Sequence, residues 1–397
     1  MSSSTPLKQD LRPESPGRAP LIAEPQPKLR LGYLDGLRGL AALYVVVHHA
    51  AFSHFDPSTF PSWLRIVMKP FAYAHFSVGM FIVLSGYCLM LPVTRSVDGS
   101  LKGGFTGFVR RRARRILPPY YAALVLSILL DQVTSIWPRP SGLHISPPVN
   151  IASPAVISHL FLVHNVNPNW IQAVDIPMWS VATEWQIYFV FALLLLPIWR
   201  RLGIWSTVAV AFVLGLAPHF LMHHPSSLDG ARFWYLGLFA LGMAGAEINF
   251  STNTTMTRLR ERTPWIALSI ILGVGLVGAS IAKQGYWTTH PWLVDPWAGL
   301  SGACLLVGLT QALTTRQEPA LVRLLDATPV RKLGEFSYSL YLIHYPILQV
   351  VAVLLASVLH SVSMNVLAGV IIGTPVAVGC AYLFSLAFEK PFLARQT

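Results

Sequence analysis

The sequence predicts an all-α, polytopic membrane protein with about ten transmembrane helices and both termini in the cytoplasm. Of its 397 residues, 53% are hydrophobic and only 12% are charged, and its mean hydropathy is +0.53. A soluble domain carries roughly twice this share of charged residues. Apolar runs of about 20 residues, the length that crosses about 30 Å of hydrocarbon, recur from Leu34 to the C-terminus.

The chain divides into a polar tail over 1–30 and an apolar domain over 31–393. The tail is rich in Ser and Pro and lacks the apolar core of a signal peptide, so we expect a disordered cytoplasmic segment. The segment 150–170 is too interrupted to span, and we expect it at the membrane interface or over the outer mouth of a cavity. The predicted spans are 34–54, 70–92, 116–133, 175–199, 204–222, 231–250, 265–283, 297–314, 336–358 and 364–388.

The distribution of basic residues orients these spans. The formal net charge is +12, but Lys and Arg gather in the tail and in alternate loops, which argues for membrane topology rather than nucleic-acid binding. By the positive-inside rule those loops are cytoplasmic, as expected for a multi-pass protein of the cell (inner) membrane. Of the 29 Lys and Arg residues, the exceptions are Arg65, Lys69, Arg139, Arg232 and Lys283.

The cysteines and the outer loops give weaker signals. Cys88, Cys304 and Cys380 lie in apolar sequence without CxxC or CxxH spacing, so we expect neither a disulfide framework nor a metal site. The outer loop 284–297 suits an aromatic belt at the membrane interface, and sugar stacking is the alternative. Its aromatic and polar residues are Tyr286, Trp287, His290, Trp292, Asp295 and Trp297.

The first span holds ionisable residues that lipid would reject. The eleven-residue step from Arg38 to His49 returns to within roughly 20° of one helical face, about 16 Å farther along the axis. Asp35 shares this face. For Asp35 and Arg38 a helix start is an equal alternative, because an acid suits the positive helix end and Arg snorkels to headgroups. His49 falls near mid-membrane, which favours a functional role.

An arginine cluster precedes the third span, with five Arg among residues 110–115. Such a cluster can anchor topology through anionic lipid. Arg112 and Arg115, three residues apart on one helical face, could also bind phosphates through their planar guanidinium groups. A cytoplasmic nucleotide-bearing donor such as an acyl-CoA would satisfy them.

The fourth span places one carboxylate, Glu184, about 14 Å inside its outer end, among aromatic and hydroxyl side chains that begin at Trp179. A buried carboxylate needs a partner, and the first span offers Arg38 and His49. The alternative is that Glu184 only neutralises an intramembrane Arg or His.

Two further motifs have mainly structural interpretations. Hydroxyl groups bind helices together in lipid, which is the simpler role for Ser337 and Ser339 in the ninth span. For Tyr338 and His344 of that span, packing and function both stay open. The stretch with Ser85, Gly86 and Tyr87 in the second span is expected to pack closely around the glycine.

These motifs, in this order, resemble the acyltransferase family 3 membrane proteins, which include bacterial O-antigen and peptidoglycan O-acetyltransferases, macrolide acyltransferases and related animal proteins. The matching motifs are Leu34-Asp35-Gly36-Leu37-Arg38-Gly39 with His49, Phe81-Ile82-Val83-Leu84-Ser85-Gly86-Tyr87, Arg112-Ala113-Arg114-Arg115-Ile116-Leu117-Pro118, Trp179-Ser180 through Glu184 and Tyr188, Gly334 through Ser337-Tyr338-Ser339 to His344, and Phe388-Glu389-Lys390-Pro391-Phe392. The family often has Glu where Trp185 stands.

The resemblance implies a ten-helix domain that takes an acyl group, usually acetyl, from cytoplasmic acyl-CoA and delivers it to a hydroxyl, often on a sugar facing away from the cytoplasm. The family's Arg-and-His motif falls on Arg38 and His49, and its arginine pair on Arg112 and Arg115.

We therefore expect CoA phosphates at Arg112 and Arg115, and neutral His49 as general base toward the acceptor hydroxyl, with Glu184 or Arg38 setting its orientation. An acyl-histidine at His49 is the alternative mechanism. A glycan acceptor is favoured over a macrolide, while acyl length and oligomeric state stay open. The rival class is a transporter with a buried Arg-His-Glu pathway.

Overall fold

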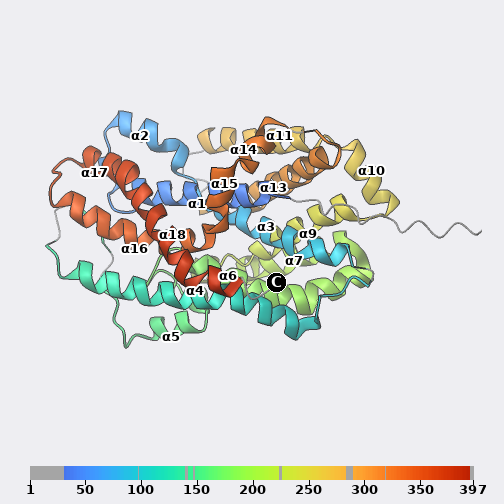
Figure 1. Cartoon of the computed structure of the whole chain (residues 1–397), viewed down its shortest axis with the longest axis horizontal. Helices are drawn as coiled ribbons and strands as arrows, with labels where there is room; N and C mark the ends of the chain where they lie inside the picture. Colours follow the sequence, from blue (N-terminus) through green and yellow to red (C-terminus); the bar gives the residue numbers. More distant parts are fainter. Residues whose placement is uncertain are drawn as a thin grey trace, which may run out of the picture. The chain divides into compact units, whose positions relative to one another are not determined.

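Helices account for all regular secondary structure in the part of the chain that the computed structural model describes (Figure 1). That part comprises residues 31–96, 98–138, 142–145, 148–222, 226–282, 289–317 and 319–393. The predicted disordered tail, 1–30, lies outside the described residues, as do Arg139, Lys283, Tyr286 and Trp287 of the predicted outer loops. The all-α prediction is confirmed for the described residues.

Long helices form the bundle, and short helices and turns cap its two ends. The long helices are α1 (Tyr33–Phe52), α3 (Ala74–Thr94), α4 (Gly104–Ser135), α6 (Met178–Val190), α7 (Leu196–Leu221), α9 (Tyr235–Phe250), α11 (Trp265–Ala282), α13 (Pro291–Thr314), α16 (Ser337–Ala356) and α18 (Thr374–Phe388). The short ones are α2 (Ser62–Met68), α5 (Pro154–Leu160), α8 (Ser226–Asp229), α10 (Thr254–Arg262), α14 (Ala320–Asp326), α15 (Thr328–Glu335), α17 (Val362–Ala368) and α19 (Lys390–Leu393). Turns of π-helix at Phe191–Leu195 and Gly369–Gly373 join α6 to α7 and α17 to α18.

Seven helical stretches of the described residues are long and apolar enough to cross a membrane, which makes the chain a polytopic membrane protein. Two predicted spans fall in one 44-residue stretch, Met178–Leu221, which bends at Gly203 with φ of 80°. α9, with 16 residues, is shorter than each of these seven stretches and is not one of them. α1 is not among the seven, since its charged and His residues lower its hydropathy. Ten spans therefore stay a prediction.

The ends of two helices differ from the predicted limits. α4 begins at Gly104, twelve residues before the predicted start of the third span, so the arginine cluster lies inside this helix. α13 begins at Pro291 rather than at residue 297. α4 continues through the arginine cluster because Arg and Ala favour helix, and α13 begins at Pro291 because Pro is favoured in the first turn of a helix.

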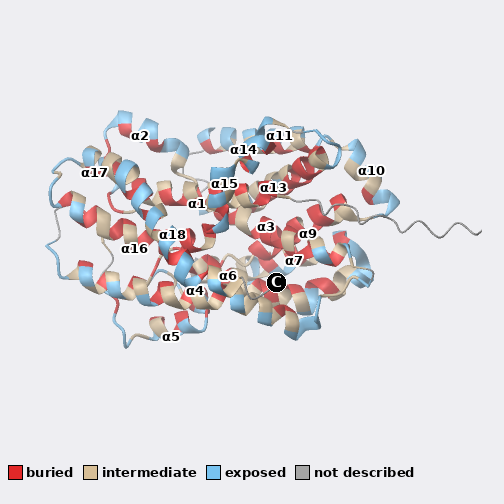
Figure 2. Cartoon of the chain, in the orientation of Figure 1, coloured by how far each residue is buried: buried red, intermediate tan, exposed pale blue. Residues whose placement is uncertain are grey.

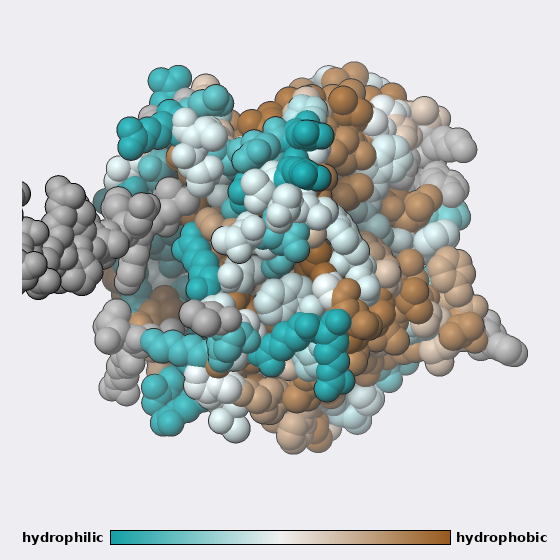
Figure 3. Space-filling view, turned by 90° about the vertical axis from the view of Figure 1, so that its right-hand side faces the viewer, coloured by the Kyte–Doolittle hydropathy of each residue, from teal (hydrophilic) through white to brown (hydrophobic). Residues whose placement is uncertain are grey.

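Burial and hydropathy follow the pattern of a membrane bundle. α3, α9 and α16 are buried along much of their length (Figure 2), whereas α7, α11 and α18 expose large apolar side chains. Figure 3 looks onto the end where α4 begins, called here the arginine end, and shows hydrophilic residues around its centre with hydrophobic residues along one side. The exposed apolar side chains include Val213, Leu214, Ile271, Val274, Ile371 and Leu383.

Glycines set the closest helix contacts. A Cβ on Gly36 of α1 would lie 1.9 Å from the carbonyl oxygen of Leu325, and one on Gly334 would lie 1.9 Å from that of Asp35. The first motif therefore packs α1 against α14 and α15. A Cβ on Gly86 would lie 2.0 Å from the Phe239 oxygen, which confirms the predicted close packing at this position.

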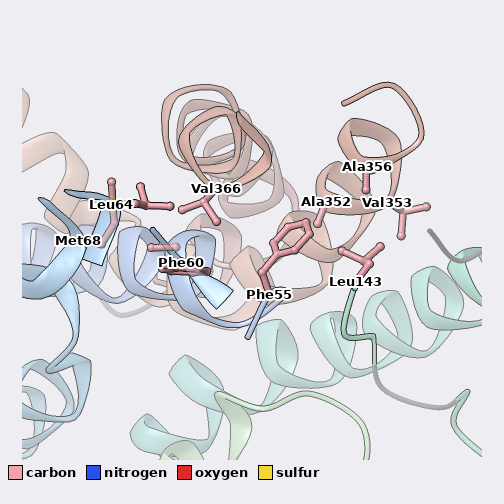
Figure 4. Packing of buried hydrophobic residues seen from close by; sticks show 10 residues of the cluster. Phe55, Phe60, Leu64, Met68, Leu143, Ala352, Val353, Ala356 and Val366 are labelled. Atoms are coloured by element: carbon pink, nitrogen blue, oxygen red, sulfur yellow. The ribbon is translucent and has the colours of Figure 1, made fainter. Parts of the chain in front are cut away.

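An apolar cluster closes the end opposite to the arginine end, called here the far end (Figure 4). Phe55 and Phe60 follow α1 and pack with Leu64 of α2 and Val353 of α16. The cluster holds the ends of α1 and α16 together, and each helix carries one of the histidines described below. Its remaining buried members are Ala51, Met68, Leu143, Ala352, Ala356 and Val366.

Candidate active site

A cavity of about 240 Å³ lies between α1, α3, α4, α6 and α16. Along α3 it extends from Cys88 to Val78, which corresponds to about 15 Å of helix. One wall is apolar, and the rest carries hydroxyl, guanidinium and carboxylate groups. The lining residues are Arg38, Val78, Phe81, Ile82, Ser85, Cys88, Leu89, Arg112, Arg115, Ile116, Ser180, Val181, Glu184, Tyr188, Ser337, Tyr338 and Tyr341.

Three guanidinium groups, those of Arg38, Arg112 and Arg115, meet at the arginine end of this cavity. Of these three arginines, Arg38 alone forms an ion pair with a described residue, at 3.5 Å from Asp35. The Nε of Arg112 is buried and has no hydrogen-bond partner. Arg112 and Arg115, which form no ion pair within the described part of the chain, can bind an anion, to which their planar groups can donate several hydrogen bonds.

Arg115 also lines a second hollow of about 310 Å³ at the arginine end. Asp35, Glu335 and Lys390 are among its other lining residues. The same arginine therefore borders both the inner cavity and a hollow at the end of the bundle.

Among the described residues, Glu184 is the only carboxylate that lines the inner cavity, and its partners come from α3 and α6. Ser85 Oγ donates to its Oε1 over 2.5 Å and the Tyr188 hydroxyl donates to the same oxygen over 2.6 Å. The expected partners on the first span, Arg38 and His49, form no hydrogen bond or ion pair with it in the described residues. The reason is the rotation of the helices about their axes, which turns Ser85 of α3 and Tyr188 of α6 toward the carboxylate.

Tyr87 faces away from the cavity, although it lies two residues after Ser85. Its hydroxyl shares a hydrogen bond of 2.7 Å with Thr310 and accepts one of 2.9 Å from Asn249. Tyr87 is fully buried, so its role is to join α3 to α9 and α13.

His49 belongs to a second cluster, farther along α1, and is not among the residues that line the cavity. Its Nδ1 shares a hydrogen bond of 2.8 Å with Ser53, and its ring lies 5.2 Å from that of His344. His344 Nδ1 donates to the Tyr341 carbonyl over 2.8 Å, which leaves its Nε2 as the acceptor; that atom has no partner. The two predicted histidines are thus brought together.

Tyr341 connects the cavity with the histidines. It lines the cavity, its ring lies 5.9 Å from His344 and 5.8 Å from Phe81, and its hydroxyl shares a hydrogen bond of 2.7 Å with Ser180. Tyr341 lies within the motif that runs from Gly334 to His344, but it was not among the candidate residues predicted from the sequence. Its position, one turn before His344, was the signal that could have identified it.

The start of α16 is fixed from two sides. The Tyr338 hydroxyl lies against the cavity and donates to the Ile116 carbonyl over 3.1 Å. Glu389, which follows α18, accepts from the Ser339 backbone N–H over 3.2 Å and from the Ser339 hydroxyl. Burial raises the pKa of Glu389. The last sequence motif therefore caps α16, which carries Tyr341 and His344.

Trp179 does not line the cavity, although the next residue, Ser180, does. Its ring instead lies 5.6 Å from the guanidinium of Arg232. Among the described residues, no group of three or more His, Cys, Asp or Glu could hold a metal ion.

Comparison with known proteins decides how this site is interpreted. Residues 31–386 match the family model Acyl_transf_3, described as an acyltransferase domain. The chain belongs to acyltransferase family 3.

Relatives of this acyltransferase-3 chain include the acyltransferase MdmB of Streptomyces mycarofaciens, 25% identical over 81% of this chain and 80% of the relative. The putative membrane-bound transacylase BcsY of Komagataeibacter xylinus is 28% identical over 90% of this chain and 84% of the relative. The peptidoglycan O-acetyltransferase OatA of Listeria monocytogenes is 24% identical over 79% of this chain and 49% of the relative. This chain thus spans about half the length of that relative. No solved structure matches it.

The family and its relatives make the chain a membrane O-acyltransferase and disfavour the transporter alternative. An acyl donor, a hydroxylated acceptor and a group that accepts the hydroxyl proton are the parts that this reaction requires.

Proposed function

We propose that this acyltransferase takes an acyl group from cytoplasmic acyl-CoA at the arginine end and transfers it to a hydroxyl of an acceptor at the far end. The acyl group that we propose is acetyl. In this proposal ten helices cross the inner membrane, both termini are cytoplasmic, and 1–30 is a tail before the acyltransferase domain. The observation that carries it is the cavity, with its three arginines and the chain of contacts through Tyr341 to His344 and His49.

The donor's phosphates bind Arg112 and Arg115, and the hollow beside Arg115 supplies the entrance. The pantetheine arm extends along the cavity, so that the thioester lies beyond Glu184. Arg38 adds positive charge on the same wall, which favours an anionic donor and, later, the departing thiolate. Two hydroxyl donors hold the Glu184 carboxylate in place on the same lining as these guanidinium groups.

His49 accepts the proton of the acceptor hydroxyl as the oxygen attacks the thioester carbonyl, and the CoA thiolate leaves. His344, whose Nε2 has no hydrogen-bond partner and whose ring lies 5.2 Å from that of His49, positions His49 and the acceptor. The second mechanism makes His49 the nucleophile, with an acyl-histidine that the acceptor then attacks.

The donor part of the proposal is tested by titrating purified protein in nanodiscs with acetyl-CoA. Arg112→Ala with Arg115→Ala should raise the Kd at least tenfold. Arg114→Ala, an exposed neighbour on the same helix, is the matched control and should bind as the parent does. If the parent, the double variant and Arg114→Ala bind acetyl-CoA with equal affinity, Arg112 and Arg115 serve only as topology anchors.

The role of His49 is tested in the same preparation. His49→Ala should abolish acetyl transfer while acetyl-CoA still binds, whereas His48→Ala, with the neighbouring ring that bonds to the Phe71 carbonyl, should retain transfer. A stoichiometric burst of free CoA without acceptor, with acetyl on His49 by mass spectrometry, would select the acyl-histidine mechanism. Parental transfer rates in His49→Ala would remove His49 from the chemistry.

A further inference from the structure

A second polar cluster lies at the far end and is built around Asp295 of α13. Asp295 is only 1% exposed. Its Oδ2 accepts hydrogen bonds from Arg232 over 2.8 Å and from the Trp234 indole over 2.9 Å. Its Oδ1 accepts none and lies 3.9 Å from Nε2 of His75 on α3. One buried carboxylate thus orients a guanidinium and an imidazole.

The backbone holds Arg232 in an unusual conformation. Its φ is +49°, in the left-handed region that side chains other than glycine rarely adopt. Its N–H donates to the Asp229 carbonyl over 3.1 Å, and Thr183 of α6 donates to the adjacent Ala231 carbonyl over 3.2 Å. Such conformations persist where the surroundings fix them, and they concentrate at ligand sites. The guanidinium lies near two indoles, 5.6 Å from the ring of Trp179 and 5.7 Å from that of Trp234.

Three polar atoms of this cluster have no hydrogen-bond partner: Asp295 Oδ1, His75 Nε2 and the Tyr235 hydroxyl. Tyr235 is fully buried, and its ring lies 5.8 Å from that of Trp179. A cluster that served only to join helices would satisfy its buried polar groups. In this cluster the three atoms can still accept or donate hydrogen bonds to a bound molecule. The side chains of Arg232 and His75 are 23% and 25% exposed.

The cluster borders the end of the cavity that is remote from the arginines of α4. His75 precedes the lining residue Val78 by one helical turn, and Trp179 directly precedes the lining residue Ser180. A molecule bound to the cluster would therefore place its nearest group at the far end of the cavity.

We propose that Trp179, Arg232 and His75 bind the acceptor, and that this acceptor is a neutral, polyhydroxylated carbohydrate. This rests on the proposed function. The charge of Arg232 is balanced by Asp295, so the site does not select an anion. Indole faces beside a few fixed donors and acceptors suit a sugar ring with several hydroxyls. An apolar macrolide would leave those groups unpaired, which is costly.

A second cluster, which also contains His, Asp and Trp side chains, adjoins this one. His219 Nδ1 lies 2.9 Å from Asp229, and its ring lies 4.9 Å from Trp292 and 6.4 Å from Trp234. The shared Trp234 joins the two clusters.

The test measures acetyl transfer from acetyl-CoA to cellotetraose and to an N-acetylglucosamine tetrasaccharide by the full chain in nanodiscs, with calorimetric binding of each tetrasaccharide in parallel. Trp179→Ala should raise the KM for a tetrasaccharide at least tenfold, while the KM for acetyl-CoA changes less than twofold. Trp179→Phe should recover most of the affinity. Trp63→Ala, an exposed indole on α2, is the control and should match the parent.

Arg232→Ala leaves Asp295 buried without its ion pair, so Arg232→Ala with Asp295→Asn is the second variant and should show the same loss of tetrasaccharide binding. Unchanged tetrasaccharide affinity in both variants, or transfer to a macrolide and to neither tetrasaccharide, would overturn the inference. If the parent binds a tetrasaccharide through Trp179 but does not bind or use acetyl-CoA, the proposed function fails and the carbohydrate site stands.

Discussion

Ser85 Oγ on α3 lies 2.5 Å from Glu184 Oε1 on α6, and the Tyr188 hydroxyl reaches the same oxygen over 2.6 Å. Two helices that are far apart in the sequence are therefore joined at the one carboxylate that, among the described residues, lines the cavity. The two hydroxyl donors fix the orientation of this carboxylate, which shares the lining with three guanidinium groups.

Replacing Glu184 by Gln should separate donor binding from turnover. The amide keeps the size of the side chain but removes the negative charge, so an anionic donor should bind at least as tightly. Acetyl transfer should fall about 100-fold or more, the usual effect of losing a group that manages protons or charge in the transition state. Acetyl-CoA titration and transfer kinetics measure the two quantities. Glu261→Gln, exposed on α10, is the control, and a parallel loss of binding and turnover would contradict this role.

The sequence alone predicted the residues of the cavity better than their pairing. Arg38 and Glu184 could be singled out because an ionisable group in an apolar span is tolerated only beside a polar space. Arg112 and Arg115 could be singled out because they lie on one helical face of a basic cluster and suit phosphate groups. Their partners depend on the rotation of each helix, which periodicity within one span cannot give. Ser85 reaches the cavity while Tyr87 faces α13, and the sequence motif contains both without distinguishing them.

The far-end cluster could not be predicted for a related reason. Arg232 appeared only as an exception to the positive-inside distribution, and Asp295 only as one member of an aromatic loop. Their contact over 2.8 Å joins residues from different loops. The available signal was one Arg and one Asp in two different predicted outer loops. Only the fold shows that these two residues form an ion pair.

Glycine substitution should distinguish helix contacts from exposed helix faces. Gly86→Ala would place a Cβ 2.0 Å from the Phe239 carbonyl oxygen, so α3 and α9 would have to separate. We expect a loss of about 1–3 kcal/mol in the free energy of unfolding, seen as a lower apparent melting temperature. Gly278→Ala, on α11, meets nothing within 4 Å and should be neutral or stabilising. A destabilisation by Gly278→Ala equal to that by Gly86→Ala would argue against the contact.

Cysteine labelling should test the number of spans at its weakest point, α9. With Cys88, Cys304 and Cys380 replaced by Ala, Met222→Cys and Asn253→Cys flank α9, whose 16 residues are short for a span. If α9 crosses the membrane, an impermeant maleimide should label Met222→Cys in intact cells and Asn253→Cys only after permeabilisation. Labelling of both from the same side would reduce the number of spans and reverse the predicted side of one terminus.

Asp175 should make the stability of the protein depend on pH in a predictable direction. It lies in the loop before α6 and is buried, with Ser127 as its hydrogen-bond donor over 3.1 Å. Burial raises its pKa to about 8, whereas in the unfolded chain it titrates near 3.9. Between these values the folded state retains a proton that the unfolded state has lost, so stability falls as pH rises through this window.

Asp175→Asn removes this titration, and thermal unfolding of both proteins in one detergent from pH 6.5 to 8.5 measures the difference. Burial lowers the pKa values of the buried pair His159 and His164 to about 4 and about 3, and their unfolded forms titrate near 6.5, but this contribution is the same in parent and variant and cancels in the difference. The parent should lose about 2 kcal/mol relative to Asp175→Asn over these two pH units. Asp56→Asn is the exposed control, because hydrogen bonding to Ser58 lowers the Asp56 pKa, away from this window. A difference between parent and Asp175→Asn that does not change with pH would show that Asp175 is already ionised in the folded protein.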